Sequence, residues 1–435
     1  MNYPEIPDFK KIYWDIVYYG NLKTEFGASG FADKLKQAEK GLLDVLEEVK
    51  ALPEDPEIRS KEPDDLSTIK TLRPEGKRRL WKVIPWDEYR RRLHGAFAGR
   101  AAGCTLGSIV ECWPIEKMEA WSRKIGQQFP PVDYWADHPE PDRVRYLVSQ
   151  CRHFTSSEMD GIPTDDDILY TLIGLLIMER FGPEFTTEEV GRAWLKHIPM
   201  AYNAASAALR NLKNGVSAEK AAEIDNPYCQ WIGGDIRSDP WAYMAPGWPE
   251  KAAEFVYRDS FLTNRRNGIY AAMYFSAVIA AAFTVNDPMD ALRIGLEEIP
   301  AQCRMADTVR WALDKKDEIA NYKDARDAVD EKFKGMDAAH SLNNACLTIW
   351  GIHIGGTDIT TVLSETVAMG LDNDCTAATA GSIVGAVIGI ENIPEHWYRN
   401  FNNKVLTYMI DHNQFELNDL LNRFEAQAER VFDYA

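Results

Sequence analysis

The sequence of 435 residues predicts an all-α protein, and three observations support this prediction. Apolar residues recur at helical spacing through most of the chain after Trp86. Alternating strand patterns flanked by hairpin turns are scarce. Clusters of acidic residues directly precede apolar runs, as they do at helix N-termini. With 13 Trp, 18 Tyr and 17 Phe the chain can fill a large core, which excludes global disorder.

The first 85 residues differ in pattern from the rest. Residues 31–52 have apolar side chains at helical spacing, whereas residues 53–79 are polar and rich in proline, as in a linker. We therefore expect a helical N-terminal extension and linker over residues 1–85, and one domain over residues 86–435.

Beyond residue 86 the helical signals follow one another closely. Residues 268–285 are apolar and rich in alanine, but they contain Ser276 and two tyrosines, which favours a buried helix over a membrane span. Helices are expected over residues 89–103, 166–181, 187–196, 204–213, 268–285, 288–296, 301–315, 359–369, 376–390 and 417–431.

One long segment, residues 226–267, shows no helical periodicity. It is rich in Gly, Pro, Trp, Asp and Arg, and it includes the stretch IGGDIRSDPW. Long segments of this kind inside a compact protein are usually functional or disordered, and the aromatic residues argue against disorder. We expect a binding loop here.

Charge and cysteine content restrict the partners and the compartment. The net charge is −18, so the surface repels nucleic acid and anionic membranes. The seven cysteines are odd in number, dispersed and never in CxxC spacing, and no apolar signal segment begins the sequence. These features predict a soluble cytoplasmic protein whose main partner is neither nucleic acid nor a membrane.

Two acidic clusters are the main candidates for a functional site. Thr164, Asp165, Asp166 and Asp167 precede the apolar run of residues 168–177. Asp372 and Asp374 precede a helix of small residues that starts near Thr376. Helix capping would explain one or two acids at each place. Clustered carboxylates also suit Mg²⁺, and two such loops facing each other could hold one or two ions.

Small residues characterise two of the expected helices. Gly381, Gly385 and Gly389 recur at every fourth position after the second cluster, which would let another helix approach closely. Residues 94–107 are similarly small and lead through a glycine turn to Glu111. Glu111 follows two apolar residues and is a candidate acid of the site.

The early small-residue helix with its acid, the TDDD cluster and the late DNDC cluster occur in the same order as in the ADP-ribosylglycohydrolase family, which residues 86–430 resemble. The resemblance implies an orthogonal multi-helix fold around a metal centre, with two Mg²⁺ or, as the other candidate, Mn²⁺. It implies Glu111 and Asp166 as catalytic residues. The implied metal ligands are Thr164, Asp165, Asp166, Asp372, Asp374 and Thr376. The implied substrate-binding residues, by their place in the 232–241 stretch, are Asp235, Arg237, Asp239 and Trp241.

The sequence departs from the family pattern at two cysteines. Cys104 stands where the family usually has an aspartate, and Cys375 where it has a threonine ligand. A neutral thiol is a poor ligand for Mg²⁺. The resemblance implies, as the expected function, a Mg²⁺-dependent hydrolase of a glycosidic bond at the anomeric carbon of a small-molecule or ADP-ribosylated substrate, with an ADP-ribosyl or nucleoside-like group. The alternatives are a catalytically impaired ADP-ribose-binding or nucleotide-binding protein and a Mg²⁺-dependent phosphohydrolase.

Overall fold

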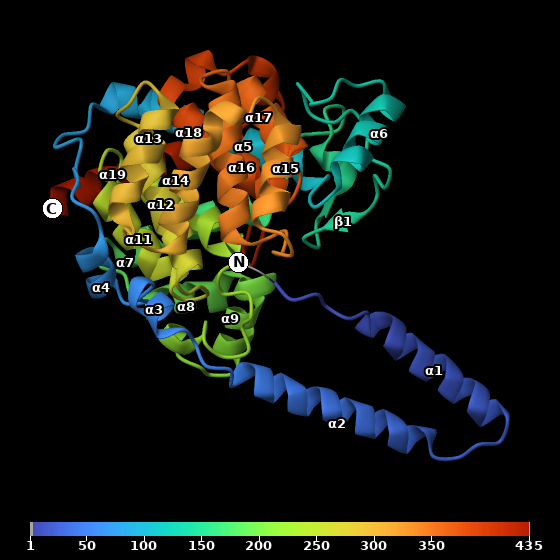
Figure 1. Ribbon diagram of the computed structural model, residues 1–435. Helices are drawn as coiled ribbons and strands as arrows, with labels where there is room; N and C mark the ends of the chain where they lie inside the picture. Colours follow the sequence, from blue (N-terminus) through green and yellow to red (C-terminus); the bar gives the residue numbers. More distant parts are fainter. Residues whose placement is uncertain (1–2, 435) are drawn as a thin grey trace. The chain divides into compact units, whose positions relative to one another are not determined.

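The computed structural model describes residues 3–434, and the chain divides into two compact units, one ending at Ser60 and one beginning at Lys61 (Figure 1). The division lies within the segment that the sequence predicts to be an extension and linker; the expected domain boundary at residue 85 stays a prediction.

The first unit consists of two long helices joined by a turn. They are α1 (Phe9–Glu25) and α2 (Phe31–Lys50), and the start of α3 (Pro56–Lys61) follows. Gly27 and Gly30 in the turn have φ values of 86° and 91°, which glycine adopts without steric cost. None of the residues of α1 and α2 is buried.

The second unit is helical, with two small antiparallel hairpins. Its helices are α4 (Leu66–Leu72), α5 (Trp86–Ser108), α6 (Ile115–Ile125), α7 (Asp166–Phe181), α8 (Thr187–His197), α9 (Asn203–Lys213), α10 (Asp239–Tyr243), α11 (Pro249–Ser260), α12 (Asn267–Ala282), α13 (Pro288–Gly295), α14 (Arg304–Lys315), α15 (Tyr322–Lys332), α16 (Ser341–Gly355), α17 (Ile359–Ala368), α18 (Asn373–Ile388) and α19 (Leu417–Tyr434). The strands are β1 (Val144–Arg145), β2 (Ser149–Gln150), β3 (Lys404–Met409) and β4 (His412–Glu416).

The all-α prediction is confirmed, and the expected apolar helix lies in the core. Every residue of α12 is buried, because neighbouring helices cover all of its faces. Among the residues that the structure describes, no helix combines the length and the apolar character needed to cross a membrane. α4, α6, α15 and α16 were not expected from the sequence pattern.

Helices α5 and α18 approach each other closely at the centre of the unit. The small residues predicted a close approach to the helix of Gly381 and Gly385, but not which helix approaches. A Cβ atom added at Gly99 would lie 2.1 Å from the carbonyl oxygen of Gly381, and one added at Gly95 would lie 2.3 Å from that of Gly385. A side chain at either position would push the helices apart. Gly389 has a different role, because it ends α18 with a φ of 76°.

The expectation of a long irregular loop over residues 226–267 is wrong for most of its length. The segment contains a 3₁₀ helix, η3 (Ile232–Arg237), as well as α10 and α11. With six and five residues, η3 and α10 carry only one or two turns of pattern, so their periodicity is hidden in the sequence. The 12 residues of α11 are enough for a helical pattern, and the sequence prediction missed this helix.

Candidate metal centre and its pocket

The first acidic cluster lies at the N-terminus of α7. Asp165 is the residue that precedes the helix, and its Oδ1 accepts a hydrogen bond from the backbone N–H of Asp167 at 3.2 Å. Its other oxygen, Oδ2, accepts a hydrogen bond from the hydroxyl of Ser108 at 2.8 Å. Asp165 therefore caps α7 and also joins it to the end of α5.

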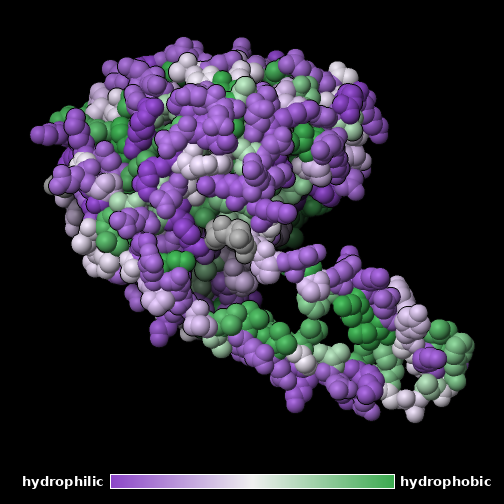
Figure 2. Space-filling view, viewed as in Figure 1, coloured by the Kyte–Doolittle hydropathy of each residue, from purple (hydrophilic) through white to green (hydrophobic). Residues whose placement is uncertain are grey.

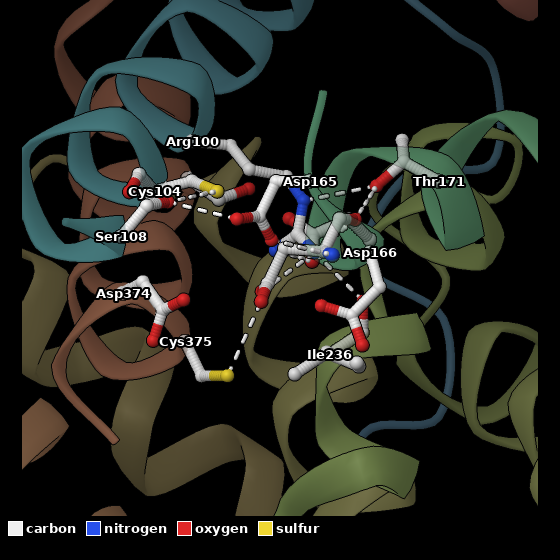
Figure 3. Close-up of polar contacts among 12 residues, drawn as sticks. Arg100, Cys104, Ser108, Asp165, Asp166, Thr171, Ile236, Asp374 and Cys375 are labelled. Atoms are coloured by element: carbon white, nitrogen blue, oxygen red, sulfur yellow. Dashed lines mark hydrogen bonds and ion pairs between the residues drawn. The ribbon is translucent and has the colours of Figure 1, made fainter. Parts of the chain in front are cut away.

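The second cluster lies at the N-terminus of α18 and meets the first. Gly107 of α5 leaves no room beside Asp374, since a Cβ atom there would lie 2.4 Å from the Cα of Asp374. The thiol of Cys375 donates a hydrogen bond to Asp167 Oδ2 at 3.2 Å. Figure 3 shows Asp374 and Cys375 of α18 facing Asp165 and Asp166 of α7. The glycine contact of the two helices thus brings carboxylates that are about 200 positions apart in sequence into one group.

The joined clusters open into a pocket of about 380 Å³. Its acidic side chains come from both clusters and from the end of α5, and its other walls are aromatic and small residues. The lining residues are Glu111, Arg143, Val144, Arg145, Tyr146, Asp166, Tyr170, Tyr202, Asn203, Ala204, Ala205, Trp231, Ile232, Gly233, Ile236, Asp372, Asp374 and Cys375.

A guanidinium group lies among these carboxylates. Arg145, at the end of β1, places Nη2 at 3.0 Å from Glu111 Oε2, 3.5 Å from Asp165 Oδ2 and 3.6 Å from Asp374 Oδ2. The neighbouring hydroxyl of Tyr146 donates a hydrogen bond to Asp166 Oδ1 at 2.6 Å. Tyr146 and Leu147 both have positive φ values, 46° and 69°, so the turn of this hairpin contains two residues in the left-handed conformation.

A second buried arginine holds the elements behind the cluster together. Arg100 of α5 donates hydrogen bonds to the carbonyl oxygens of Asp167 at 2.8 Å and Ile236 at 2.7 Å. It also forms an ion pair with Asp239, 2.6 Å apart. Helices α5, α7 and α10 and the 3₁₀ helix η3 are therefore fixed by one side chain.

Burial changes the acidity of the cluster. It raises the pKa values of Asp166 and Asp374 well above the usual range, and the nearby carboxylates Asp165 and Glu111 add to the effect. It also raises the pKa of Asp372 to about 7. Carboxylates buried so close together favour either a shared proton or a cation.

The donor atoms present fit a divalent cation. Oxygen atoms of Glu111, Asp372 and Asp374 lie within 4.8 Å of one another, and so do ligand atoms of Asp167, Asp374 and Cys375. Oδ1 of Asp372, Oδ1 of Asp374 and Oγ1 of Thr376 are buried without a hydrogen-bond partner among the described residues. Buried oxygens of this kind are costly unless a ligand satisfies them.

The structure brings most of the predicted ligands together. Glu111, Asp166, Asp372 and Asp374 line the pocket, and Asp165 lies directly behind it. Thr164 and Thr376 are buried next to the clusters in sequence, but neither lines the pocket.

The four residues expected to bind substrate lie elsewhere. Asp235, Arg237, Asp239 and Trp241 are at most 2% exposed, and none of them lines the pocket. Arg237 donates a hydrogen bond to Thr263, and the ring of Trp241 stacks on Phe185 at 4.7 Å. These contacts are with the core of the protein. We therefore do not include the four residues in the proposed substrate site.

Sequence reasoning missed Arg145 and Tyr146, and it placed Asp167 in the first acidic cluster without giving it a catalytic or metal-binding role. Asp167 was assigned to neither role although it bonds to both Arg100 and Cys375. Arg145 and Tyr146 line the pocket, but they lie in a segment with no motif, so no local signal in the sequence identifies them.

Comparisons with known proteins give a family match for the sequence and a similar fold. The sequence model described as ADP-ribosylglycohydrolase matches residues 85–430. A solved structure described as "ADP-ribosylglycohydrolase-related protein complex" is similar in fold, with a TM-score of 0.50 and 21% sequence identity. The similarity covers 80% of this chain and 99% of that one. A search of curated proteins finds no match.

Proposed function

Because the chain belongs to the ADP-ribosylglycohydrolase family, a family of hydrolases, we propose that it cleaves the glycosidic bond at the anomeric carbon of an ADP-ribosyl group. The proposal includes a divalent cation, Mg²⁺ or Mn²⁺, held by the acidic centre. Carboxylate oxygens are the ligands that both cations prefer.

The convergence of the two acidic clusters on one pocket is the observation that carries the proposal. Helix capping would explain each cluster alone, but it does not explain why both open into the same pocket. It also does not explain the buried oxygens of Asp372 and Asp374 that have no partner. A cation site between the clusters accounts for both facts.

The residues of the centre have different proposed roles, either as cation ligands or as the proton acceptor. Asp372 and Asp374 would hold the cation together with Asp165, Asp166 or Asp167, and Thr376 is a further candidate ligand. A cation bound there supplies a Lewis acid that orients ribose hydroxyls and polarises water. Glu111 lines the pocket at the edge of the centre, and its side chain is 34% exposed, so it can receive a proton from a water molecule on the substrate side.

The remaining walls suit the rest of an ADP-ribosyl group. Tyr202, which is 48% exposed, and Trp231 offer flat apolar surfaces to a base or a sugar. Arg143 and Arg145 line the same pocket and provide positive charge for a diphosphate.

A binding protein that does not cleave its ligand is the second candidate, and two observations favour it. The Arg145 guanidinium already neutralises part of the acidic centre, and Cys375 places a thiol where a hydroxyl ligand is expected. Such a protein would bind ADP-ribose without turnover.

Paired substitutions test the proposal. We expect Asp374→Asn and Asp166→Asn to abolish hydrolysis of N-linked or O-linked ADP-ribosides and to weaken Mg²⁺ binding in a calorimetric titration, while the fold persists. Asp160→Asn is the matched control, because Asp160 lies just before the first cluster, is exposed and pairs with Lys404.

The results separate the candidate functions. Turnover of an ADP-riboside that both substitutions abolish supports the glycohydrolase. ADP-ribose binding without turnover by the wild type would assign the non-catalytic role, and activity on a phosphomonoester alone would assign a phosphohydrolase. Full activity in both variants would contradict a catalytic metal centre at this site.

A further inference from the structure

The helices of the first unit expose an unusual amount of apolar surface. Of the large apolar side chains exposed among the described residues, 19 of 30 lie before residue 61. Figure 2 shows that the apolar side chains of α1 and α2 gather on the sides of the two helices that face each other, while polar side chains occupy the outer side of α2. Monomeric soluble proteins rarely expose apolar patches of this extent.

The two helices do not cover each other. Phe31 packs against Gly20, where an added Cβ atom would lie 2.0 Å from the phenyl ring, and this contact fixes the turn. Beyond it the apolar residues remain open: Leu42 is 62% exposed, Val49 56% and Tyr19 66%. The inner side of the hairpin therefore needs a partner.

The pattern of α2 indicates the kind of partner. Apolar residues recur at alternating spacings of four and three over the whole helix and up to two positions beyond it, as in the core of a coiled coil. These residues, called the α2 seam below, are Phe31, Leu35, Ala38, Leu42, Val45, Val49 and Leu52.

The α2 seam is complementary to itself in the antiparallel direction. When two copies of α2 are placed side by side with residue 40 of one opposite residue 40 of the other, large residues meet small ones: Phe31 with Val49, Leu35 with Val45, and Leu42 with Ala38. Layers of this kind fill space without voids. The sequence thus specifies one register for a pair of identical helices.

Charges beside the seam agree with the same register. Lys34 and Glu48 both occupy the position just before a seam residue, and they are equally far from Gly41. With residue 40 opposite residue 40, Glu48 of each copy lies two positions, or about 3 Å along the helix axis, from the point opposite Lys34 of the other copy. The two side chains reach across this offset, so two ion pairs form. Flanking charges of this kind set orientation and partner choice in coiled coils.

The aromatic side chains of α1 supply further area. Phe9, Tyr13, Trp14, Tyr18, Tyr19 and Phe26 are between 42% and 73% exposed. Covering the exposed part of each removes roughly 100 Å² from water, or roughly 600 Å² for the six. A stable interface buries about 800 Å² on each partner, and the α2 seam supplies the remainder.

We propose that the first unit is a dimerisation arm, in which two copies of the α1–α2 hairpin pair through antiparallel α2 seams to form a four-helix bundle. A membrane surface fits less well, because α2 has five acidic and four basic residues and the whole chain has a net charge of −18. The anionic lipids that commonly attract peripheral helices would repel it.

Sedimentation of the full-length protein tests the proposal directly. We expect a dimer in the micromolar range, and we expect Leu42→Glu to raise the dimer dissociation constant by about 30-fold or more, because it places a charge in the seam of both copies. Lys40→Glu is the control, because Lys40 lies outside the seam, and its dimer should persist. A monomeric wild type, or a dimer unaffected by Leu42→Glu, would overturn the proposal.

Charge exchange tests the register. Lys34→Glu and Glu48→Lys should each weaken the dimer severalfold, and the double variant should restore it, since the exchanged charges again face each other. Failure of the double variant to restore association would rule out the antiparallel register.

A cross-link provides a second test of orientation. Gly41 has no atom near an added Cβ, so Gly41→Cys is tolerated on the surface of α2, and in the antiparallel dimer the two new thiols lie next to each other. We expect a disulfide-linked dimer that the wild type does not form. No cross-link in a protein that still dimerises would contradict the antiparallel pairing, and flotation of a monomer with anionic vesicles would assign the hairpin to membranes instead.

Discussion

Arg145 competes with any cation for the carboxylates of the centre. One of its nitrogens lies within 3.6 Å of oxygens of Glu111, Asp165 and Asp374, and its side chain is only 11% exposed. A charge pair near 4 Å contributes on the order of 4 kcal/mol at the effective dielectric constant of protein sites. The guanidinium therefore stabilises the acidic centre when no cation is bound and opposes the entry of one.

Removing this charge should strengthen cation binding. We expect Arg145→Ala to lower the dissociation constant for Mn²⁺ by roughly tenfold, equivalent to about 1.4 kcal/mol, in a calorimetric titration. The control is Arg143→Ala, because Arg143 lies on the same hairpin and lines the pocket, but its ion pair is with Glu140, 3.6 Å away. Equal Mn²⁺ affinities in the wild type and Arg145→Ala would show that the Arg145 guanidinium does not oppose cation binding.

The sequence predicted the acidic residues of the centre but not their basic neighbours. Asp166, Asp372 and Asp374 could be identified because runs of acids before an apolar helix form a local pattern. Arg145 and Arg100 could not, since their partners are 20 to 229 positions away and no local pattern marks them. Asp235, Arg237, Asp239 and Trp241, which the sequence suggested for substrate binding, are buried in the core and do not line the pocket. Their polar and aromatic side chains are typical of a binding loop. In the structure these side chains instead form buried ion pairs and ring contacts inside the core.

At the scale of elements, one helix contact determines the position of the acids. Residues 95, 99, 103 and 107 of α5 each lie against the backbone of α18 or of Gly389 just after it, and the stripe ends beside Asp374. The sequence predicted a close approach at Gly381 and Gly385, but it did not identify α5 as the partner. Small residues show that some helix approaches, whereas the choice of partner is a property of the whole fold.

A methyl group in this contact should destabilise the protein. We expect Gly99→Ala to lower the free energy of unfolding of the second unit by about 1–3 kcal/mol, because the added carbon would lie 2.1 Å from the backbone oxygen of Gly381. Urea unfolding followed by tryptophan fluorescence measures the change. Gly233→Ala is the control, since an added Cβ there meets no atom within 4 Å, and its stability should stay within about 0.5 kcal/mol of the wild type. Unchanged stability in Gly99→Ala would mean that the helices can separate easily.

At the scale of the whole molecule, buried histidines and buried aspartates have opposite effects on how the free energy of unfolding changes in acid. Burial lowers the pKa of His340 to about 4, and it lowers those of His94, His138, His197 and His353 as well. A neutral buried histidine binds fewer protons than it does in the unfolded chain, so its contribution to stability is present above pH 6.5 and is lost as the pH falls towards 4. The buried aspartates, whose pKa values are raised, have the opposite dependence.

A variant of His340 separates these effects. The Nδ1 atom of His340 accepts the backbone N–H of Leu342 at the start of α16, and asparagine can provide the same kind of cap without titrating. As the pH falls from 6.5 to 4, the free energy of unfolding should decrease by up to about 3 kcal/mol less in His340→Asn than in the wild type. Urea unfolding at each pH measures this difference. Parallel pH profiles would show that His340 takes up its proton without unfolding the protein.

The contact between α5 and α18 also has a consequence for the order in which the molecule is completed. Gly99 and Gly381, which touch in the finished protein, are almost 300 residues apart in the chain. At a synthesis rate of about 5–20 residues per second, α5 leaves the ribosome roughly 15–60 s before its partner. During that time the glycine face of α5 exposes its backbone, because the glycines have no side chains to cover it. In the nascent chain this face of α5 therefore stays unpacked until α18, nearly the last helix, has been synthesised. Only then can the acidic centre form.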